Sequence, residues 1–489
     1  MAAAELMAPL MFAALVVFLL LGLPVAFSLA ALGLASGWVA IQLDLFPAAF
    51  MANLPYRVFG IISNELLLSI PFFTLMGAIL ERSGLAEDLL EGFAQLFGGL
   101  PGGLAYAVVV VGAILGAITG TVAASVIAMG VIALPIMMRV GYSHRMATGV
   151  IAASGTITQV IPPSLVLIVL ADQLGRSVGD MYLGAIGPSI AQVVIFLLFI
   201  FVASVFSPKS MPPLPESERT RSGWPLLWTV ARGVAPSLAL IFVVLGTIFT
   251  GLATPTEAGA MGVLGAIVLA GLHRRLSWNM IRQGMQSTMS ITVMVIFILI
   301  GATVFTLVFQ GVDGGPWIEH MFARVGADDP ISFLVLVNIL IFLLAFFLDF
   351  FEIAFIVIPL LAPMAEKLGI DLIWFGVLIC VNMQTSFMHP PFGFALFYLR
   401  GIAPRAVKSS DIYMGAIPWV GLQLLLVGVL IFFPELVTGL LERPTAGDVQ
   451  SIEIRLDETA IPSDGADGPS AAGASSAGQE DPAEYFKRR

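Results

Sequence analysis

Two consecutive prolines, Pro162 and Pro163, interrupt an apolar segment within the stretch A-A-S-G-T-I-T-Q-V-I-P-P-S (152–164). Proline lacks a backbone N–H and its ring clashes with the preceding turn, so a helix cannot run unbroken through the pair. Irregular backbone at bilayer depth is tolerated only where it is buried in protein or lines a cavity. The hydroxyl and amide side chains around the break therefore predict a discontinuous transmembrane helix at a binding site.

The composition fixes the class of protein. Apolar residues make up 58% of the chain and charged residues 11%, against about 25% charged in soluble proteins. Apolar runs long enough to cross a bilayer recur between residues 5 and 440. We therefore expect an all-α polytopic membrane protein, since a transmembrane barrel would show short alternating segments. The first apolar run has no basic region or cleavage site before it, which indicates an uncleaved first helix.

Several functional classes lack their residues in this sequence. The single cysteine, Cys380, excludes an intramolecular disulfide and a cysteine-based metal cluster. The sequence contains no H-E-x-x-H, G-x-S-x-G or Walker motif. We therefore expect neither an enzyme nor a bound cofactor, and the net charge of −10 argues against nucleic acid as a partner.

The break has a counterpart in the second half of the chain, N-M-Q-T-S-F-M-H-P-P-F-G (382–393), which carries Pro390 and Pro391. The stretch 179–186 also matches 410–417, at an offset of 231 (410 − 179). Two interrupted helices in corresponding places of two repeats point to the binding site of a transporter.

The repeat divides the chain as follows. We expect a first repeat over 1–206, with a re-entrant hairpin at about 104–138 and a broken helix at about 146–172. A cytoplasmic linker over 207–225 leads to a second repeat over 226–440, with a hairpin at about 331–364 and a broken helix at about 372–400. The chain then ends in an acidic, disordered tail over 441–489. We also expect one helix over about 59–81, a surface-lying amphipathic segment over 82–103, and a polar loop between a helix over 286–310 and the second hairpin.

Lysine and arginine give the orientation. If both hairpins are re-entrant, the loops at 82–103, 139–145, 207–232, 273–285 and 400–413 fall on one side and hold most of these residues before the tail. The positive-inside rule makes this side cytoplasmic. The two repeats are then inverted, and both termini are periplasmic.

Unwound turns free carbonyl groups that can face a cation, and half-helix N-termini attract a carboxylate. The side chains near the breaks and hairpin tips add neutral and acidic oxygens, which suit sodium. The candidates for binding sodium or substrate are Thr119, Gly120, Thr121, Ser125, Ser154, Gly155, Thr156, Ser164, Asp349, Glu352, Asn382, Gln384, Thr385 and Ser386.

Each candidate group has a structural alternative. The hydroxyls could bond back to carbonyls freed by a proline kink, and Gly112, Gly116 and Gly120 could serve close helix packing. Asp349 and Glu352 could hold a cation, take up a proton or pair with a base. His389 could titrate or simply fill a polar pocket.

Two shorter motifs outside the breaks favour structural roles. Asn64-Glu65 favours an interfacial or subunit-contact patch. Thr254-Pro255-Thr256-Glu257 is typical of a helix start, with Thr254 as the cap.

Five stretches resemble the large membrane subunit of the TRAP transporters, the tripartite ATP-independent periplasmic carriers. They are T-G-T-V-A-A-S (119–125), P-I-M-M-R-V-G-Y (135–142), A-S-G-T-I-T-Q-V-I-P-P-S (153–164), T-P-T-E-A-G-A (254–260) and the Pro-Pro segment at 390–391. The segment T-S-F-M-H-P-P-F-G-F-A-L-F-Y-L-R-G (385–401) looks most like the branch for mannitol, chloroaromatic and 2-oxo acid uptake.

The resemblance implies an elevator-type, sodium-driven importer of a small organic acid in the bacterial inner membrane. It also implies two partners besides membrane lipid, a four-helix small membrane subunit and a periplasmic substrate-binding protein. The alternatives are a stand-alone sodium/anion symporter or an ion channel of similar architecture. An intramembrane enzyme would need a catalytic constellation that the sequence lacks.

Overall fold

The computed structural model describes residues 2–219 and 223–441, and every regular element in these ranges is helical. The first repeat region contains α1 (Ala2–Leu20), α2 (Val25–Gln42), η1 (Ala48–Ala52), α3 (Asn53–Ile62), η2 (Glu65–Leu68), α4 (Ser69–Arg82), α5 (Leu85–Phe97), α6 (Gly103–Thr119), α7 (Val122–Val140), α8 (His144–Thr156), η3 (Ile157–Gln159), α9 (Leu165–Gln173) and α10 (Val178–Phe206). The rest contains η4 (Pro208–Ser210), η5 (Glu216–Glu218), α11 (Trp224–Phe249), α12 (Pro255–Leu272), α13 (Trp278–Gly311), α14 (Gly314–Arg324), α15 (Pro330–Leu344), α16 (Phe350–Glu352), η6 (Ile353–Val357), α17 (Ile358–Lys367), α18 (Leu372–Met388), α19 (Phe394–Ile402), α20 (Ser409–Phe432) and α21 (Glu435–Thr438).

Within the described residues, seven helices are long and apolar enough to cross a bilayer, namely α2, α7, α10, α11, α12, α13 and α20. The bent pair α3–α4 makes an eighth if it is counted as one span. Helices α6, α15 and α18, which belong to the hairpins and a broken helix, are apolar but shorter. This confirms the predicted all-α polytopic membrane protein.

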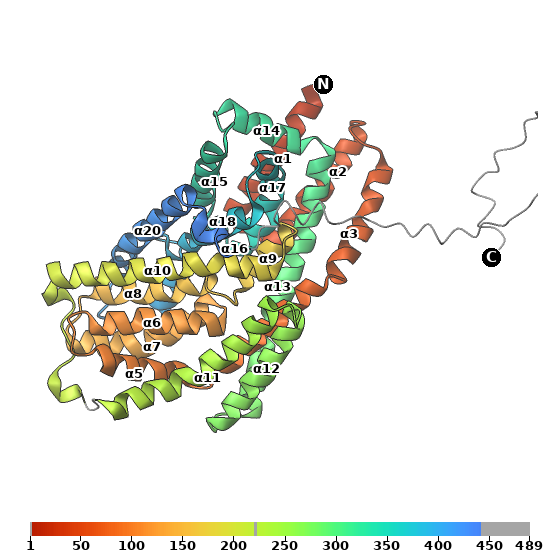
Figure 1. Ribbon diagram of the computed structural model, residues 1–489. Coiled ribbons are helices and arrows are strands. Elements are labelled where there is room, and N and C mark those ends of the chain that lie inside the picture. The colour runs from red at the N-terminus through yellow and green to blue at the C-terminus, as the bar shows by residue number, and fades with distance from the viewer. Residues whose placement is uncertain (1, 220–222, 442–489) are drawn as a thin grey trace, which may run out of the picture. The chain divides into compact units, whose positions relative to one another are not determined.

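The helices pack in two groups. In the first, α13 lies along α2, α12 along α4, and α11 beside α12 (Figure 1). Glycines permit the α2–α13 contact, because a Cβ at Gly301 would lie 2.4 Å from the carbonyl oxygen of Ala26. In the second group, α8 packs against α6, α7 and α20, and α18 packs against α10, α15 and α20.

The second group contains the predicted hairpins and broken helices. The first hairpin is α6 and α7, which turn at Gly120 and Thr121. The second is α15 and α17, joined through α16 and the π-helical segment η6. The first broken helix is α8 and α9, and the second is α18 and α19.

The two repeats exchange equivalent contacts. α8 of the first repeat packs on α20 of the second, and α18 of the second packs on α10 of the first. Gln192 of α10 and Gln423 of α20, which correspond at the offset of 231, bond directly to each other at 2.9 Å. A contact between two equivalent residues lies on a two-fold axis, so an approximate two-fold relates the repeats.

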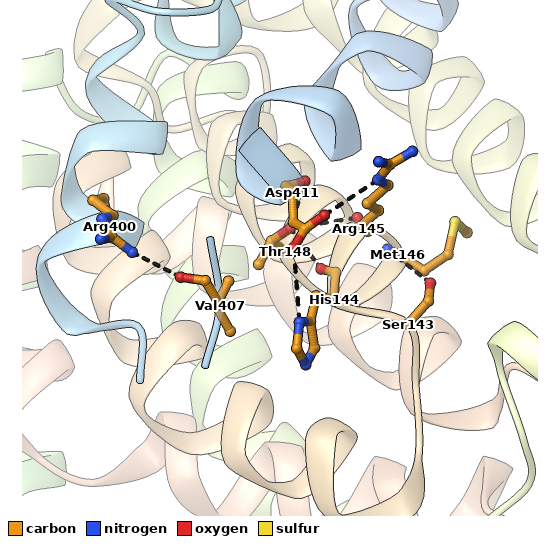
Figure 2. A network of polar contacts seen from close by, with 8 residues as sticks. All are labelled: Ser143, His144, Arg145, Met146, Thr148, Arg400, Val407 and Asp411. Atoms are coloured by element: carbon orange, nitrogen blue, oxygen red, sulfur yellow. Dashed lines mark hydrogen bonds and ion pairs between the residues drawn. The ribbon is translucent and has the colours of Figure 1, made fainter. Parts of the chain in front are cut away.

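The loops that the charge pattern assigns to one side lie together. Ser143 donates its N–H to the carbonyl of Ser210, and Gly102 donates to that of Met211. A Cβ at Gly84 would lie 3.7 Å from the guanidinium of Arg275. Figure 2 shows a further contact, between the 139–145 turn and the start of α20. These loops therefore share one end of the helix bundle.

Four local expectations differ from the structure. The helix expected over 59–81 bends by 43° at residues 63–64, where Asn64 caps the next turn. The polar loop expected after residue 310 contains α14, and the helix expected to begin at 286 begins at Trp278. The linker over 207–219 lies against α5 and the base of α6, with Met211 and Leu214 buried. The acidic tail falls outside the described residues.

Candidate functional site

The first break begins where α8 ends at Thr156. One 3₁₀ turn follows, and the helix resumes only at Leu165, so Pro162 and Pro163 break it as predicted. Ser164 caps the second half, because its hydroxyl accepts a hydrogen bond from the Val166 N–H at 3.1 Å. The same hydroxyl donates to the carbonyl of Gln159 across the break. Ser164 therefore stabilises both edges of the gap.

The other hydroxyls around this break bond to their own helix. Ser154 donates to the carbonyl of Val150 at 2.7 Å, Thr156 to that of Ala153 at 2.8 Å, and Thr158 to that of Gly155 at 3.1 Å. All three residues have no exposed surface. These are the back-bonds of the kink interpretation, and each hydroxyl oxygen keeps lone pairs that can accept or coordinate.

The tip of the first hairpin meets this break. Gly120 has a left-handed backbone (φ +62°), and a Cβ there would lie 3.9 Å from the carbonyl oxygen of Pro163. Gly112 and Gly116 of α6 face α8 and η3, where added Cβ atoms would lie 2.7 Å from the Cβ of Ser154 and 3.0 Å from the Cα of Thr158. The packing function of these glycines and the position of the tip at the break are thus compatible.

The other candidate residues of the first tip and the first break lie in the same area. Gly155 packs against Val126 of α7, where an added Cβ would come within 2.3 Å of a methyl group. Ser125 is buried, and Thr121 is the residue before α7, half-buried and without a side-chain cap bond. Thr119 ends α6, and its side chain lies outside the described atoms.

The second break follows α18, which ends at Met388, and the chain is helical again only from Phe394. The amide of Asn382 donates to the backbone carbonyl of Asn338 at 2.8 Å and to its side-chain oxygen at 3.0 Å. Thr385 and Ser386 bond back to the carbonyls of Asn382 and Met383, both at 2.7 Å. The prolines 390 and 391 break this helix as predicted.

The second hairpin meets the second break through aromatic rings. Phe346, two residues after the end of α15, stacks on the ring of His389 with centroids 4.2 Å apart and planes 15° apart. Phe342 meets the same ring edge-on at 4.4 Å. His389 is 1% exposed, so it fills a pocket, as one interpretation held, but the pocket is aromatic.

The two acids of the second tip cap a helix. Asp349 accepts the N–H of Glu352 at 2.8 Å, and Glu352 accepts the N–H of Asp349 at 2.9 Å. This reciprocal pair is a capping box. It starts α16, whose residues contact α9 and α13. Within the described residues, neither Asp349 nor Glu352 forms the salt bridge with a base that was one of the alternatives for these acids.

The two broken helices cross at their breaks. The hydroxyl oxygen of Thr156 lies 3.7 Å from the sulfur of Met388, and Cys380 contacts the carbonyl of Gln159 at 3.4 Å. The two breaks and two hairpin tips thus form one region. It contains two buried oxygens, Gln159 Oε1 and Asn382 Oδ1, that accept no hydrogen bond from the described residues.

Three glutamines join the helices beside this region. Gln192 donates to Gln384 at 2.6 Å and to Gln423 at 2.9 Å, and Gln423 donates to the carbonyl of Val381 at 2.9 Å. Sequence analysis selected Gln384 but missed Gln192, Gln423 and Asn338. The first two match each other at the offset of 231, which was an available signal. Asn338 had no such signal, because it lies in an apolar helix and its partner Asn382 is 44 residues away.

A charged cluster ties the ends of α8 and α20 outside the break region. Asp411, in the first turn of α20, lies 3.3 Å from Arg145 and 3.8 Å from His144 (Figure 2). Arg400, in the last turn of α19, donates to the carbonyl of Val407 at 2.7 Å and so joins α19 to the loop before α20. The contacts of Asp411 hold the starts of α8 and α20 together.

Two motifs outside the breaks now have structural explanations. Thr254 caps α12 in a capping box with Glu257, as predicted. Asn64 makes an internal contact, because its amide donates to Asp172 at 2.6 Å and so joins η2 to the end of α9. The interpretation of Asn64-Glu65 as an interfacial or subunit-contact patch stays a prediction.

Comparison with known proteins decides the family. A family model described as "Tripartite ATP-independent periplasmic transporter, DctM component" matches residues 12–436. The chain belongs to the DctM family. This confirms the family resemblance, and the chain is therefore a transporter permease and not an enzyme.

DctM relatives match almost the full described chain. The C4-dicarboxylate TRAP transporter large permease protein DctM of Pseudomonas aeruginosa is 30% identical over 81% of this chain and 90% of its own length. The corresponding protein of Vibrio cholerae is 28% identical, over 88% of this chain and 96% of its own. The sialic acid large permease SiaM of Vibrio cholerae is 25% identical, over 85% and 93%.

A solved structure shares the fold. The YdaH transporter of Alcanivorax borkumensis, described as having an unusual topology, superposes with a TM-score of 0.60 at 15% identity, over 84% of this chain and 97% of that one. At this identity the likeness concerns the fold alone.

Proposed function

We propose that this DctM-family protein couples inward sodium movement to the uptake of a small organic acid. The observation that carries the proposal is the pair of hairpin tips set against two crossing helix breaks. Such broken helices supply free carbonyls for cations and half-helix N-termini for a carboxylate. The relatives named for C4-dicarboxylate, 2,3-diketo-L-gulonate and sialic acid all carry acids, which supports an organic anion as substrate.

Sodium would be held by neutral oxygens of the breaks and tips. We propose Asn382 and Gln159 as ligands because their side-chain oxygens are buried without a donor among the described residues, and unpaired buried oxygens are costly. Ser154, Gly155, Thr156, Ser164, Gln384, Thr385 and Ser386, with Thr119, Gly120, Thr121 and Ser125 of the first tip, remain candidates. Asp349 and Glu352 act first as caps, so we rank them below the amides.

The transport cycle would be of the elevator type. The first helix group would stay fixed while the group with the hairpins and breaks moves across the membrane. A separate small membrane subunit and a periplasmic binding protein would complete the system, consistent with the tripartite family description. The isethionate permease DctMQ is longer than this chain, which matches 65% of it. The substrate branch stays a prediction, as do the bacterial inner membrane and the periplasmic position of both termini.

Reconstitution tests the coupling. Proteoliposomes would contain this chain and its small subunit, with binding protein and labelled acid outside. We expect uptake only with an inward sodium gradient and only with the binding protein. Uptake without the gradient would refute sodium coupling, and uptake without the binding protein would favour the stand-alone symporter or channel.

A variant tests the sodium ligands. Asn382→Ala should raise the sodium concentration for half-maximal uptake about tenfold, the loss of roughly one ligand's interaction. Asn53→Ala is the matched control, because the Asn53 amide is exposed and donates to the carbonyl of Phe50, three residues before it in the chain. An unchanged sodium dependence in Asn382→Ala would remove this residue from the site.

Labelling tests the orientation. A cysteine introduced near residue 460 should react with an impermeant reagent added from the periplasmic side. The native Cys380 is buried and should stay unlabelled. Labelling only after lysis would reverse the proposed orientation.

A further inference from the structure

A cavity of about 700 Å³ lies between α5, α11 and α12, away from the breaks and tips. Its charged and polar lining comes from three elements: Asp88 and Glu91 of α5, Arg232 of α11, and His273 just after α12. Trp228, Leu269 and Leu272 supply apolar walls. We propose that this cavity binds the headgroup of an aminophospholipid, with the phosphate on Arg232 and His273 and the ammonium on Asp88 and Glu91.

The position of the cavity suits a headgroup. α11 has 26 residues and would be about 39 Å long, against about 30 Å of hydrocarbon, so its ends reach the interface. Trp224, Trp228 and Arg232 recur every four residues and so share one face of α11. Both tryptophans are exposed, as is Trp278 at the start of α13. Exposed tryptophan is typical of the headgroup level.

Two of the helices that frame the cavity, α5 and α11, are in close contact beside it. α5 contacts α11 at Gly92, where an added Cβ would lie 3.0 Å from Val230, and at Gly233 of α11, where an added Cβ would lie 3.6 Å from Leu89. Asp88 and Glu91 each precede one of these contact residues, so they flank the contact. The cavity opens beside it, where α12 ends.

Opposite charges line this cavity without pairing. Among the described residues, no salt bridge joins Asp88 or Glu91 to Arg232 or His273. His273 donates through Nδ1 to the carbonyl of Leu269 at 2.9 Å, so Nε2 is the nitrogen left for a ligand, and it donates to a phosphate when the ring carries both protons. A ligand that carries both charges can satisfy both walls at once, which a simple anion cannot.

The chemistry discriminates among lipids. A primary ammonium offers three N–H donors to carboxylates, as a lysine does, whereas a trimethylammonium offers none. A glycerol headgroup has no cation for Asp88 and Glu91. Arginine suits the phosphate because its donors are fixed in a fork. The expected order of binding is therefore phosphatidylethanolamine, then phosphatidylcholine, then phosphatidylglycerol.

Native mass spectrometry of the complex with its small subunit tests the proposal. After delipidation, each of the three lipids, or inorganic phosphate, is added back and the bound fraction measured. We expect one phosphatidylethanolamine per complex, with Arg232→Ala weakening it about tenfold, the loss of roughly one charge-assisted hydrogen bond. The double variant Asp88→Asn, Glu91→Gln should remove the preference for phosphatidylethanolamine over phosphatidylglycerol.

Controls share the charge and exposure of the tested residues. Arg282→Ala and Glu216→Gln change exposed residues that do not line the cavity and should leave binding unchanged. Arg232→Lys keeps the charge and should retain part of the binding, and its unfolding temperature shows whether the fold is intact.

Three results would overturn the proposal. Equal retention of phosphatidylglycerol and phosphatidylethanolamine would make the site a plain phosphate site, and saturation by inorganic phosphate would make its ligand free phosphate. Lipid binding that is unaffected by Arg232→Ala would exclude the cavity. Protection of α5 and α11 from hydrogen exchange by the small subunit, without lipid, would make that subunit the occupant.

Discussion

At the scale of single residues, small side chains decide how closely the hairpin approaches the break. Gly112 leaves room for Ser154, whose own hydroxyl turns back to the carbonyl of Val150. In the second repeat Asn382 occupies the position equivalent to Ser154, at an offset of 228, and reaches Asn338 on the second hairpin. The same contact is thus made by small residues in one repeat and by paired amides in the other.

The close contact between α6 and α8 predicts that a methyl group added at Gly112 lowers the stability of the protein. In Gly112→Ala the new Cβ would lie 2.7 Å from the Cβ of Ser154 and 2.8 Å from its carbonyl oxygen. Both atoms lie at or next to the backbone of α8 and cannot rotate away, so α6 must shift. Overpacking of this kind costs about 1–3 kcal/mol. Thermal unfolding in detergent should show a lower midpoint.

The control for this variant is Gly428→Ala in α20. No atom lies within 4 Å of a Cβ at Gly428, and alanine favours the helix. Its midpoint should be unchanged or slightly higher. Equal midpoints for Gly112→Ala and the wild type would contradict the close approach of α6 and α8.

At the scale of secondary-structure elements, polar residues join helices that hydrophobicity alone would not align. Lipid tails are as apolar as leucine, so helix association in a membrane depends on packing and on hydrogen bonds between helices. Gln192, Gln384 and Gln423 bind three helices of both repeats together. Their register fixes how the two broken helices cross.

The glutamine cluster predicts a non-additive loss of stability. Gln192→Leu removes the donor of both Gln384 and Gln423, and leaving buried polar groups unpaired costs about 1–3 kcal/mol each. Replacing all three by leucine removes both sides of these bonds and should cost less than the sum of the single variants. Unfolding midpoints of the three single variants and the triple variant measure this, and simple additivity would argue against a shared network.

The linker between the repeats is also a packed element. Met211 has no exposed surface, and the chain around it bonds to Gly98, Gly102 and Ser143. It therefore clamps the base of the first hairpin to α5.

This clamp makes Met211 sensitive to a polar substitution. Met211→Ser should lower the unfolding midpoint, since burying an unpaired hydroxyl and losing a large apolar side chain together cost about 2–5 kcal/mol. Ser217→Ala, at an exposed position six residues on, should have no effect. Unchanged stability of Met211→Ser would mean that the linker is not docked.

At the scale of the whole molecule, a hydrogen bond between Asn64 and Asp172 joins the first helix group to the second, and it would have to break if one group moved against the other. Asn64 caps the turn at the bend before α4 and donates at 2.6 Å to Asp172, where α9 ends. Asp172 also receives the amide of Gln173 at 2.9 Å. If the second group moves against the first, this bond must break.

The bond therefore predicts a shift between transport conformations. Asn64→Ala should destabilise the conformation described here, and a bond to a charged acceptor is worth about 1.5–3 kcal/mol. Accessibility of a cysteine placed on α9 to impermeant reagents should change accordingly. Asp172→Asn should act in the same direction but less, because a neutral oxygen still accepts. Identical accessibility in all three proteins would show that the bond does not depend on conformation.

Much of this protein could be predicted from sequence because the signals are local. Proline pairs break helices wherever they stand, apolar length predicts spans, and the Thr254 cap lies within four residues of its partner Glu257. The same locality explains the errors. The bend at residues 63–64 has no proline or glycine to signal it. Helix α14 begins with Gly314-Gly315-Pro316 and has no long apolar run, so these residues predicted a loop.

The sequence by itself determined the class of protein, the repeat, both breaks and the family. Only the tertiary structure decided which polar groups meet: Gln192 with Gln423, Asn338 with Asn382, and Asn64 with Asp172. These partners lie 44 to 231 residues apart. A buried amide or carboxylate needs a partner, but its sequence neighbours do not identify that partner. The packing of the helices does: the two-fold contact between the repeats brings Gln192 to Gln423, and packing within one repeat brings the other two pairs together.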